Sequence, residues 1–234
     1  MQKGRALKYS VFVLAGVLLV LGLHFTRKWL KQVGFIPIQV VTFSNKLQHS
    51  DPALIKAAVT EHLKLGFFGL DMRRIRQDLI AVPWVANATV QRCWPDALKI
   101  KILERQPLAI WNDKGIVDTE GKLFFPSSLA NLEDIPRFDG PEEYVNEMVD
   151  MYLLILSTLK PVGLAVKKLE IMSDQGWRAA LDNGVTIVLG QTEIQERLAR
   201  FVVARESVMA KGHDKDLTID LRYTNGLSVT WRHS

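Results

Sequence analysis

The 234-residue chain is 48% hydrophobic and 24% charged, a composition typical of a folded protein and not of a low-complexity chain. Its formal net charge of +5 comes from one end. Residues 1–31 hold six of the 30 Lys and Arg residues and no Asp or Glu, so the remaining 24 face 25 acidic residues. This nearly neutral remainder excludes the basic surface of a nucleic-acid-binding protein. Cys93 is the only cysteine, which excludes an intrachain disulfide.

Residues 9–26 form an 18-residue run without a charge, bounded by Lys8 and Arg27. As a helix this run would span about 27 Å, close to the roughly 30 Å of a bilayer's hydrocarbon core. A cleavable signal peptide is the alternative, but no small-x-small cleavage site follows the run. The cations on its two sides nearly balance, although a long following domain can be exported regardless of local charge. We therefore expect a cytoplasmic tail at residues 1–8, an uncleaved transmembrane helix at 9–26 and an exported body.

The first folded unit is expected to begin with a strand and two helices. Residues 36–43 alternate enough for a strand. Asp51-Pro52 favours an N-cap followed by proline at the first helical position, and we expect Gly66 to end that helix. A second helix is expected to start at Asp71 and to end before Pro83, because the residue before proline is pushed out of the helical region.

Two further strands, at 86–94 and 97–104, are expected around a turn at Trp94-Pro95-Asp96. In the second strand, Leu98, Ile100 and Ile102 alternate with Lys99, Lys101 and Leu103. The predicted order over residues 36–104 is thus strand, helix, helix, strand, strand. A three-stranded sheet with both helices on one face would bury every apolar stripe.

Residues 105–234 predict a mixed, mostly antiparallel sheet with two long helices, which makes the whole chain an α+β protein. The strands are expected at 108–111, 116–118, 123–125, 166–172, 177–181, 185–189, 217–223 and 227–231. The tight-turn sequence Asp182-Asn183-Gly184 separates two of them.

The two helices of this second unit are expected at 142–159 and 192–210. Tyr144, Met148, Met151, Tyr152 and Ile155 are spaced to form the apolar side of the first. In the second, Thr192 and Gln195 fit a capping box, and Glu196 and Arg200 fit an i,i+4 ion pair.

Two stretches carry a resemblance to a known protein family. The order of the first unit resembles a POTRA domain. The residues from Trp84 to Trp111 resemble the signature of the FtsQ/DivIB family of bacterial cell-division proteins, through Trp84-Val85, Val90, Arg92, Trp94-Pro95-Asp96, Leu98, Ile100, Glu104, Pro107 and Trp111. The segment Asp220–Gly226, followed by Val229 and Trp231, resembles the C-terminal segment of the same family.

This resemblance implies a bitopic scaffold of the division machinery, linking early and late division proteins at the septum. It implies a single-pass type II protein of the inner membrane, with the C-terminal body in the periplasm. In the family the last strand takes up a segment of the partner FtsB, which is paired with FtsL, and other divisome membrane proteins are implied as partners. The implied contact residues are Arg222, Tyr223, Asn225, Gly226, Ser228, Thr230 and Trp231. A recruitment face on the POTRA domain would comprise Asn87, Val90 and Arg92.

The residues of the last strand favour partner binding in their own right. The strand ends within four residues of the end of the sequence, so we expect it at a sheet edge. Residues 227–231 contain no charge or proline of the kind that usually protects such an edge. An open edge beside an Arg, a Tyr and a Trp suits the addition of a peptide strand. The alternative is that Tyr223 and Trp231 serve only in packing.

One departure from the family pattern lies before Trp177. Where an Arg is expected, this chain has Ser173-Asp174-Gln175. If an acidic side chain of the partner normally meets that Arg, this chain must hold it differently.

No sequence motif predicts catalysis. P-loop, GxSxG and HExxH patterns are missing, the five histidines lack metal-ligand spacing, and Cys93 has no histidine near it in sequence. Asp118 and Glu120 could form a carboxylate pair, but they lie on a turn, where carboxylates are usually solvated. We therefore expect no enzyme, cofactor, metal or small-molecule substrate. The alternative function is a membrane-anchored POTRA module for polypeptide export or outer-membrane assembly, although such proteins usually carry tandem modules or a β-barrel.

Overall fold

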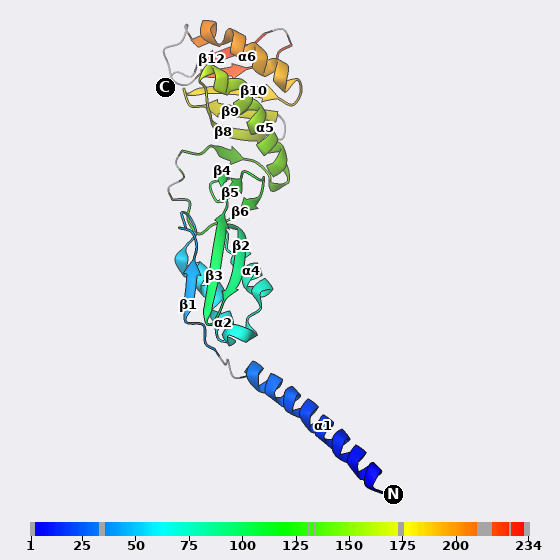
Figure 1. Cartoon of the computed structure of the whole chain (residues 1–234). Helices are drawn as coiled ribbons and strands as arrows, with labels where there is room; N and C mark the ends of the chain where they lie inside the picture. The colour runs from blue at the N-terminus through cyan, green and yellow to red at the C-terminus, as the bar shows by residue number, and fades with distance from the viewer. Residues whose placement is uncertain are drawn as a thin grey trace. The chain divides into compact units, whose positions relative to one another are not determined.

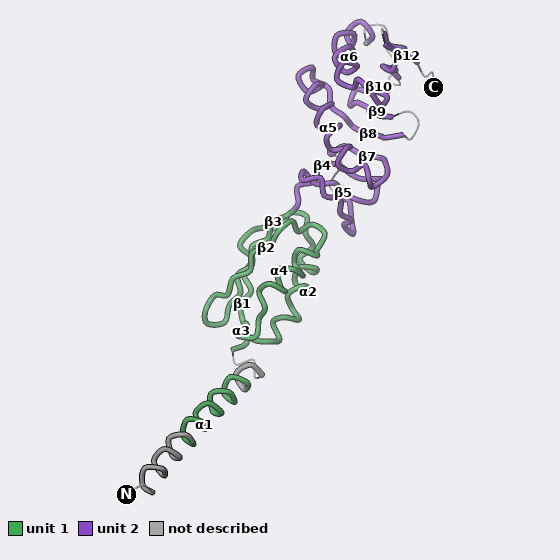
Figure 2. The backbone as a smooth tube through the Cα atoms, turned by 90° about the vertical axis from the view of Figure 1, so that its right-hand side faces the viewer, with its two compact units in different colours: residues 1–104 green, residues 105–234 purple. Residues whose placement is uncertain are grey.

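The computed structural model describes residues 3–32, 36–130, 132, 134–172, 176–209, 217–224 and 226–231, without the side chains of 3–13, 29–32 and 209. The chain divides into two compact units, residues 1–104 and 105–234, which are coloured separately in Figure 2. Each unit has its own cluster of buried hydrophobic side chains. The mixture of helices and sheets confirms the predicted α+β class.

The first unit begins with helix α1 (Lys3–Gln32), which contains the whole uncharged run. Large apolar side chains along it are exposed, among them Leu14, Leu18 and Phe25. Among the helices of the described residues, none is both long enough and apolar enough to cross a membrane.

The rest of the first unit has the predicted strand and helix order, with one short additional helix. Its elements are β1 (Val40–Phe43), α2 (Pro52–Leu63), α3 (Gly66–Gly69), α4 (Met72–Ile80), β2 (Val85–Cys93) and β3 (Ala97–Glu104). The strand order is β1-β3-β2, with β1 parallel and β2 antiparallel to β3 (Figure 1). Ile55 of α2 and Ile75 of α4 are fully buried with Leu98 and Ile100 of β3, so both helices cover one face of the sheet.

The helix starts of this unit follow local capping chemistry. The Asp51 carboxylate accepts a 2.8 Å hydrogen bond from the backbone N–H of Ala53, at the start of α2. The Asp71 carboxylate accepts from the N–H groups of Arg73 and Arg74, at the start of α4. These bonds lower the pKa of Asp71. The predicted N-cap at Asp51 and the predicted helix start at Asp71 are both confirmed.

Two predicted boundaries in this unit were wrong. The first strand begins at Val40 and not at residue 36, because the start of the predicted strand is bonded to α3 and not to the sheet. The Ile36 carbonyl accepts from Phe67 N–H at 2.8 Å, and Gln39 N–H donates to the Asp96 carbonyl at 3.0 Å. Helix α2 ends at Leu63, and Gly66, at φ +65°, begins α3 where it was expected to end α2.

The second unit contains a nine-stranded sheet within the described residues, in the order β12-β11-β10-β9-β8-β7-β4-β5-β6. Its strands are β4 (Pro107–Trp111), β5 (Gly115–Asp118), β6 (Leu123–Phe124), β7 (Arg137–Asp139), β8 (Val166–Met172), β9 (Gly176–Leu181), β10 (Val185–Gly190), β11 (Leu217–Asp220) and β12 (Ser228–Trp231). Three pairings are parallel, β10 with β11 and β7 with both β4 and β8, and the other five are antiparallel. A mixed, mostly antiparallel sheet is therefore confirmed.

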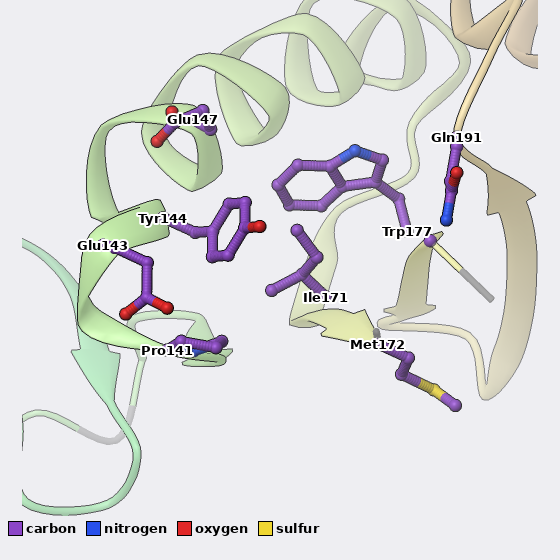
Figure 3. Close-up of a pocket in the computed structure, with 9 residues that line it drawn as sticks. Pro141, Glu143, Tyr144, Glu147, Ile171, Met172, Trp177 and Gln191 are labelled. Atoms are coloured by element: carbon purple, nitrogen blue, oxygen red, sulfur yellow. The ribbon is translucent and has the colours of Figure 1, made fainter. Parts of the chain in front are cut away.

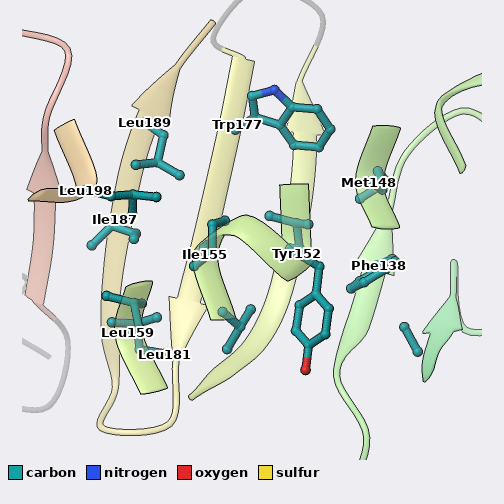
Figure 4. Close-up of a cluster of buried hydrophobic side chains, with 14 of the residues drawn as sticks. Phe138, Met148, Tyr152, Ile155, Leu159, Trp177, Leu181, Ile187, Leu189 and Leu198 are labelled. Carbon is teal, nitrogen blue, oxygen red and sulfur yellow. The ribbon is translucent and has the colours of Figure 1, made fainter. Parts of the chain in front are cut away.

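Helices α5 (Val145–Leu159) and α6 (Ile194–Met209) pack on this sheet, and the short turns η1 (Glu142–Tyr144) and η2 (Lys160–Val162) flank α5. Figure 4 shows part of the resulting core, in which the rings of Phe138 and Tyr152 lie 5.4 Å apart. Ile155 of α5 and Leu198 of α6 are fully buried in the same cluster as Ile187 of β10. Burial of such side chains contributes about 1.5–3 kcal/mol each to folding.

Two details of the helices were predicted wrongly. Tyr144 lies in η1 and not on the buried stripe of α5, and its side chain is 40% exposed, while the neighbouring Val145 is buried. Helix α6 begins at Ile194 and not at 192. Glu193, with φ at +54°, is the residue directly before it, so Thr192 is not the N-cap.

Candidate partner-binding edge

Strand β12 is an outer strand of the nine-stranded sheet (Figure 1). It pairs antiparallel with β11, with Ser228 opposite Asp220 and Trp231 opposite Leu217. No other described strand pairs with its second side. The structure therefore places the last strand at a sheet edge, as the sequence suggested. Backbone N–H and C=O groups on the outer side of such a strand are available to a further strand.

The side chains around β12 differ in burial. Trp231 is half-buried and packs against the core of the second unit, so packing accounts for part of its role. Thr230 is exposed, and Ser228 is half-buried. Tyr223, in the turn before the strand, is 57% exposed and outside the core.

A shallow, open hollow of about 530 Å³ lies beside this strand. Its lining residues are Tyr223, Thr224, Gly226, Leu227 and Ser228. A Cβ atom at Gly226 would meet no atom within 4 Å, so the backbone there is openly accessible. Asn225, also predicted as a contact residue, lies outside the described residues. The structure thus brings Tyr223, Gly226 and Ser228 to one surface.

Arg222 follows the end of β11 by two residues and is held in place by Asp220, the last residue of that strand. Its Nη2 donates to Asp220 Oδ2 at 2.7 Å, and its Nε and backbone N–H each donate to Oδ1 at 3.0 Å. These bonds from Arg222 lower the pKa of Asp220. The guanidinium therefore sits at the entrance to the turn in a fixed position, with about half of the side chain exposed.

Arg200 of α6 fixes the same turn and was missed at the sequence level. Its Nη1 donates to the carbonyl of Tyr223 at 2.9 Å and to that of Thr224, and its Nη2 reaches the carbonyl of Leu221 at 3.5 Å. The sequence predicted an ion pair with Glu196 instead. Spacing within a helix suggests only neighbours on that helix, and nothing local signals a partner 23 residues away.

The three residues predicted as a recruitment face all lie on β2, but two are occupied within their own unit. The Asn87 side-chain oxygen accepts from Arg76 Nη2 at 2.9 Å. Arg92 donates to the Leu70 carbonyl, and its guanidinium carbon lies 6.0 Å from the centre of the Phe67 ring. Val90 is half-buried against the core. Polar groups that would recognise a partner here already serve the fold.

The turn carboxylates require a correction. Asp118 is only 2% exposed, and its Oδ2 accepts a 2.8 Å bond from the buried Arg105 Nη1. Its Oδ1 accepts from the backbone N–H groups of Glu120 and Lys122, so the carboxylate closes the turn. The expectation of a solvated turn carboxylate was wrong for Asp118. Within the described residues, no group of three or more His, Cys, Asp and Glu side chains is arranged to hold a metal ion.

A second hollow, of about 560 Å³, lies between the start of α5 and the ends of β8 and β9 (Figure 3). Tyr144 and Trp177 stand on opposite sides of it, and Glu143 and Glu147 lie on the α5 side. Residues 173–175, which include the Asp174 that departs from the family pattern, lie outside the described residues. Tyr144 provides an exposed aromatic residue away from β12, against which Tyr223 can be compared.

Comparisons with known proteins cover both units. Residues 36–105 match the family model described as POTRA domain, FtsQ-type, and residues 109–222 match that described as cell division protein FtsQ/DivIB, C-terminal. Cell division protein FtsQ of Allochromatium vinosum is 31% identical over 84% of this chain and 78% of its own length. The protein of the same description from Shewanella oneidensis is 31% identical over 91% of this chain and 80% of its own length. That from Coxiella burnetii is 27% identical over 85% of this chain and 82% of its own length.

Proposed function

Because the chain belongs to the FtsQ/DivIB family of cell-division proteins, we propose that it is a scaffold linking early and late division proteins at the septum. It captures an FtsB-like segment, paired with an FtsL-like protein, by adding that segment as a strand beside β12. The observation that carries this proposal is the position of β12 as an outer strand whose residues, Ser228–Trp231, include no charge or proline.

The surroundings of β12 suit an added strand. The outer backbone groups of the strand would supply main-chain hydrogen bonds, which give affinity without requiring a particular partner sequence. The exposed ring of Tyr223 would add apolar contact area beside that ladder, and Tyr and Trp are enriched among residues that dominate interface energies. Arg222 would bring a positive charge to an acidic group of the partner, in competition with Asp220.

The same scaffold is proposed to be a single-pass type II protein of the inner membrane, with its body in the periplasm. Residues 9–26 carry no charge, lie within one continuous helix, and include large apolar side chains that are exposed in the fold. Such a tether would confine β12 to the membrane plane and raise its effective concentration toward membrane-bound partners. A phosphatase reporter fused after Ser234 should be active only outside the cytoplasm, and activity of a cytoplasm-specific reporter at that position would refute the topology.

Strand capture is tested by titrating a peptide of the FtsB-like partner into the full chain in detergent. Tyr223→Ala should weaken binding by about 2 kcal/mol, roughly thirtyfold in Kd, as measured by calorimetry. Tyr144→Ala is the matched control, because it removes another exposed tyrosine of the same unit. Circular dichroism should remain unchanged for both variants. Equal affinity for parent and Tyr223→Ala, or an equal loss in both variants, would contradict capture at β12.

A further inference from the structure

Several large apolar side chains of the first unit are exposed and belong to no core, and three of them lie close together in the fold. Trp94 is 80% exposed, Phe68 53% and Leu65 52%. Trp94 lies in the turn between β2 and β3, and the other two residues lie at α3. Folding does not require a tryptophan in such an exposed turn, and exposed apolar patches usually mark interaction surfaces.

Backbone contacts bring these residues to one end of the unit. The hairpin turn is bonded to the segment at 36–39, because Gln39 N–H donates to the Asp96 carbonyl. Helix α3 is bonded to the same segment, because Phe67 N–H donates to the Ile36 carbonyl. Arg92 also connects the hairpin to the Phe67 ring, which contacts the Phe68 ring at 5.4 Å. Figure 2 shows α3 beside β1, at the end of the unit where the described chain resumes.

This end is also the one closest in sequence to the uncharged run. Only four residue steps separate Gln32, the last residue of α1, from Ile36, a distance of at most roughly 14 Å for extended chain. The helical residues 27–32 add about 9 Å. Residues 27–35 contain three cations and no acidic residue, a composition attracted to anionic head groups. If residues 9–26 cross a bilayer, this end of the unit lies within reach of its surface.

We propose that Trp94, Phe68 and Leu65 rest in the interfacial layer of the membrane that holds α1. Tryptophan prefers this layer, where its apolar ring and its N–H group are both accommodated. The inference rests on the proposed membrane anchor and adds a second contact point. Two contacts with the bilayer would fix the height and orientation of the first unit, which a linker alone would leave variable.

The test measures tryptophan fluorescence of the full chain in phosphatidylethanolamine–phosphatidylglycerol vesicles. All measurements are made on the Trp29→Phe variant, which lacks the tryptophan that flanks the uncharged run at residues 9–26. Lipids brominated near the head group should quench one component of the emission. Adding Trp94→Phe should abolish that component, with unchanged circular dichroism because the ring lies outside the core. The control adds Ala81→Trp to the variant that already carries Trp29→Phe and Trp94→Phe. Residue 81 is exposed and follows the C-terminal end of α4. The emission of the tryptophan placed there should be quenched several-fold more by aqueous acrylamide than by brominated lipid.

The outcomes separate the two proposals. Failure of the chain to float with vesicles after a carbonate wash would contradict the anchor itself. A chain that floats, but whose Trp94 emission is quenched by acrylamide and not by brominated lipid, would overturn the interfacial contact alone. That second result would point to a protein partner for the exposed aromatic residues.

Discussion

The two surfaces expected to bind partners differ in what their side chains already contact. On β2, Asn87 accepts a bond from Arg76, and Arg92 donates to the carbonyl of Leu70. At β12, the exposed Tyr223 is outside the core, and the turn that carries it is held from behind by Arg200. Both strands are outer strands of their sheets.

From this difference we expect that an edge position alone does not make a docking surface. Polar side chains that are bonded inside their own unit must give up those bonds before they can recognise a partner, at a cost of about 1–3 kcal/mol each. The support of the β12 turn comes from Arg200 of α6, so the exposed Tyr223 need not change partners, whereas Arg222 would have to give up its bonds to Asp220. We therefore expect mutations at β2 to act on folding and mutations around β12 to act on binding.

The largest effect is expected for Arg200→Ala, which removes the support of the β12 turn. Its bonds to the carbonyls of Tyr223 and Thr224 join a charged donor to neutral acceptors. Their loss should weaken partner-peptide binding by about 1.5–3 kcal/mol, or roughly tenfold to a hundredfold in Kd. Calorimetry with the partner peptide measures the loss.

Arg205→Ala is the control for Arg200→Ala. Arg205 lies on the same helix, and among the described residues its hydrogen bonds go to Val202 and Glu206 of that helix. It should retain the parent's affinity. If Arg200→Ala also bound with the parent's affinity, the position of the turn would be irrelevant to capture, and the comparison between the two edges would lose its basis.

A smaller effect, on stability, is expected for Arg92→Ala. This change removes the bond to the Leu70 carbonyl and the contact with the Phe67 ring. The first unit should lose about 1–2 kcal/mol of unfolding free energy in urea, whereas the affinity for the partner peptide should not change. Arg73→Ala, at an exposed position of α4, is the matched control and should stay within about 0.5 kcal/mol of the parent. Loss of binding by Arg92→Ala without loss of stability would restore β2 as a recruitment face.

Features that depend on neighbouring residues could be predicted from the sequence. The N-cap at Asp51, the helix start at Asp71, the alternation along β3 and the turn at Asp182-Asn183-Gly184 each follow from a few consecutive residues. Each of them is confirmed.

Features that depend on distant residues could not be predicted. The buried ion pair of Arg105 and Asp118 joins two short stretches across a hairpin, and Arg200 meets a turn from another element. Strand β7 has only three residues, too few to show a period, yet it joins β4 to β8. Side-chain periodicity also placed Tyr144 on α5, because it does not distinguish the preceding 3₁₀ turn from the helix itself.

The smallest effect on stability is expected from breaking the Asp220–Arg222 pair. Like the contact of Arg92 near β2, this pair is made within its own unit by an arginine close to an outer strand. Hydrogen bonds from Arg222 hold the pKa of Asp220 below its ordinary value of 3.8. The carboxylate therefore stabilises the fold above pH 3.8, and this contribution is lost as the pH falls through the lowered pKa. Because the pair is partly exposed, Asp220→Asn should cost less than about 1 kcal/mol at neutral pH. Urea unfolding of parent and variant should converge in strong acid, and Arg222→Gln should behave in the same way. A difference in stability that persisted below the lowered pKa would show that Asp220 stabilises the edge by some means other than its charge.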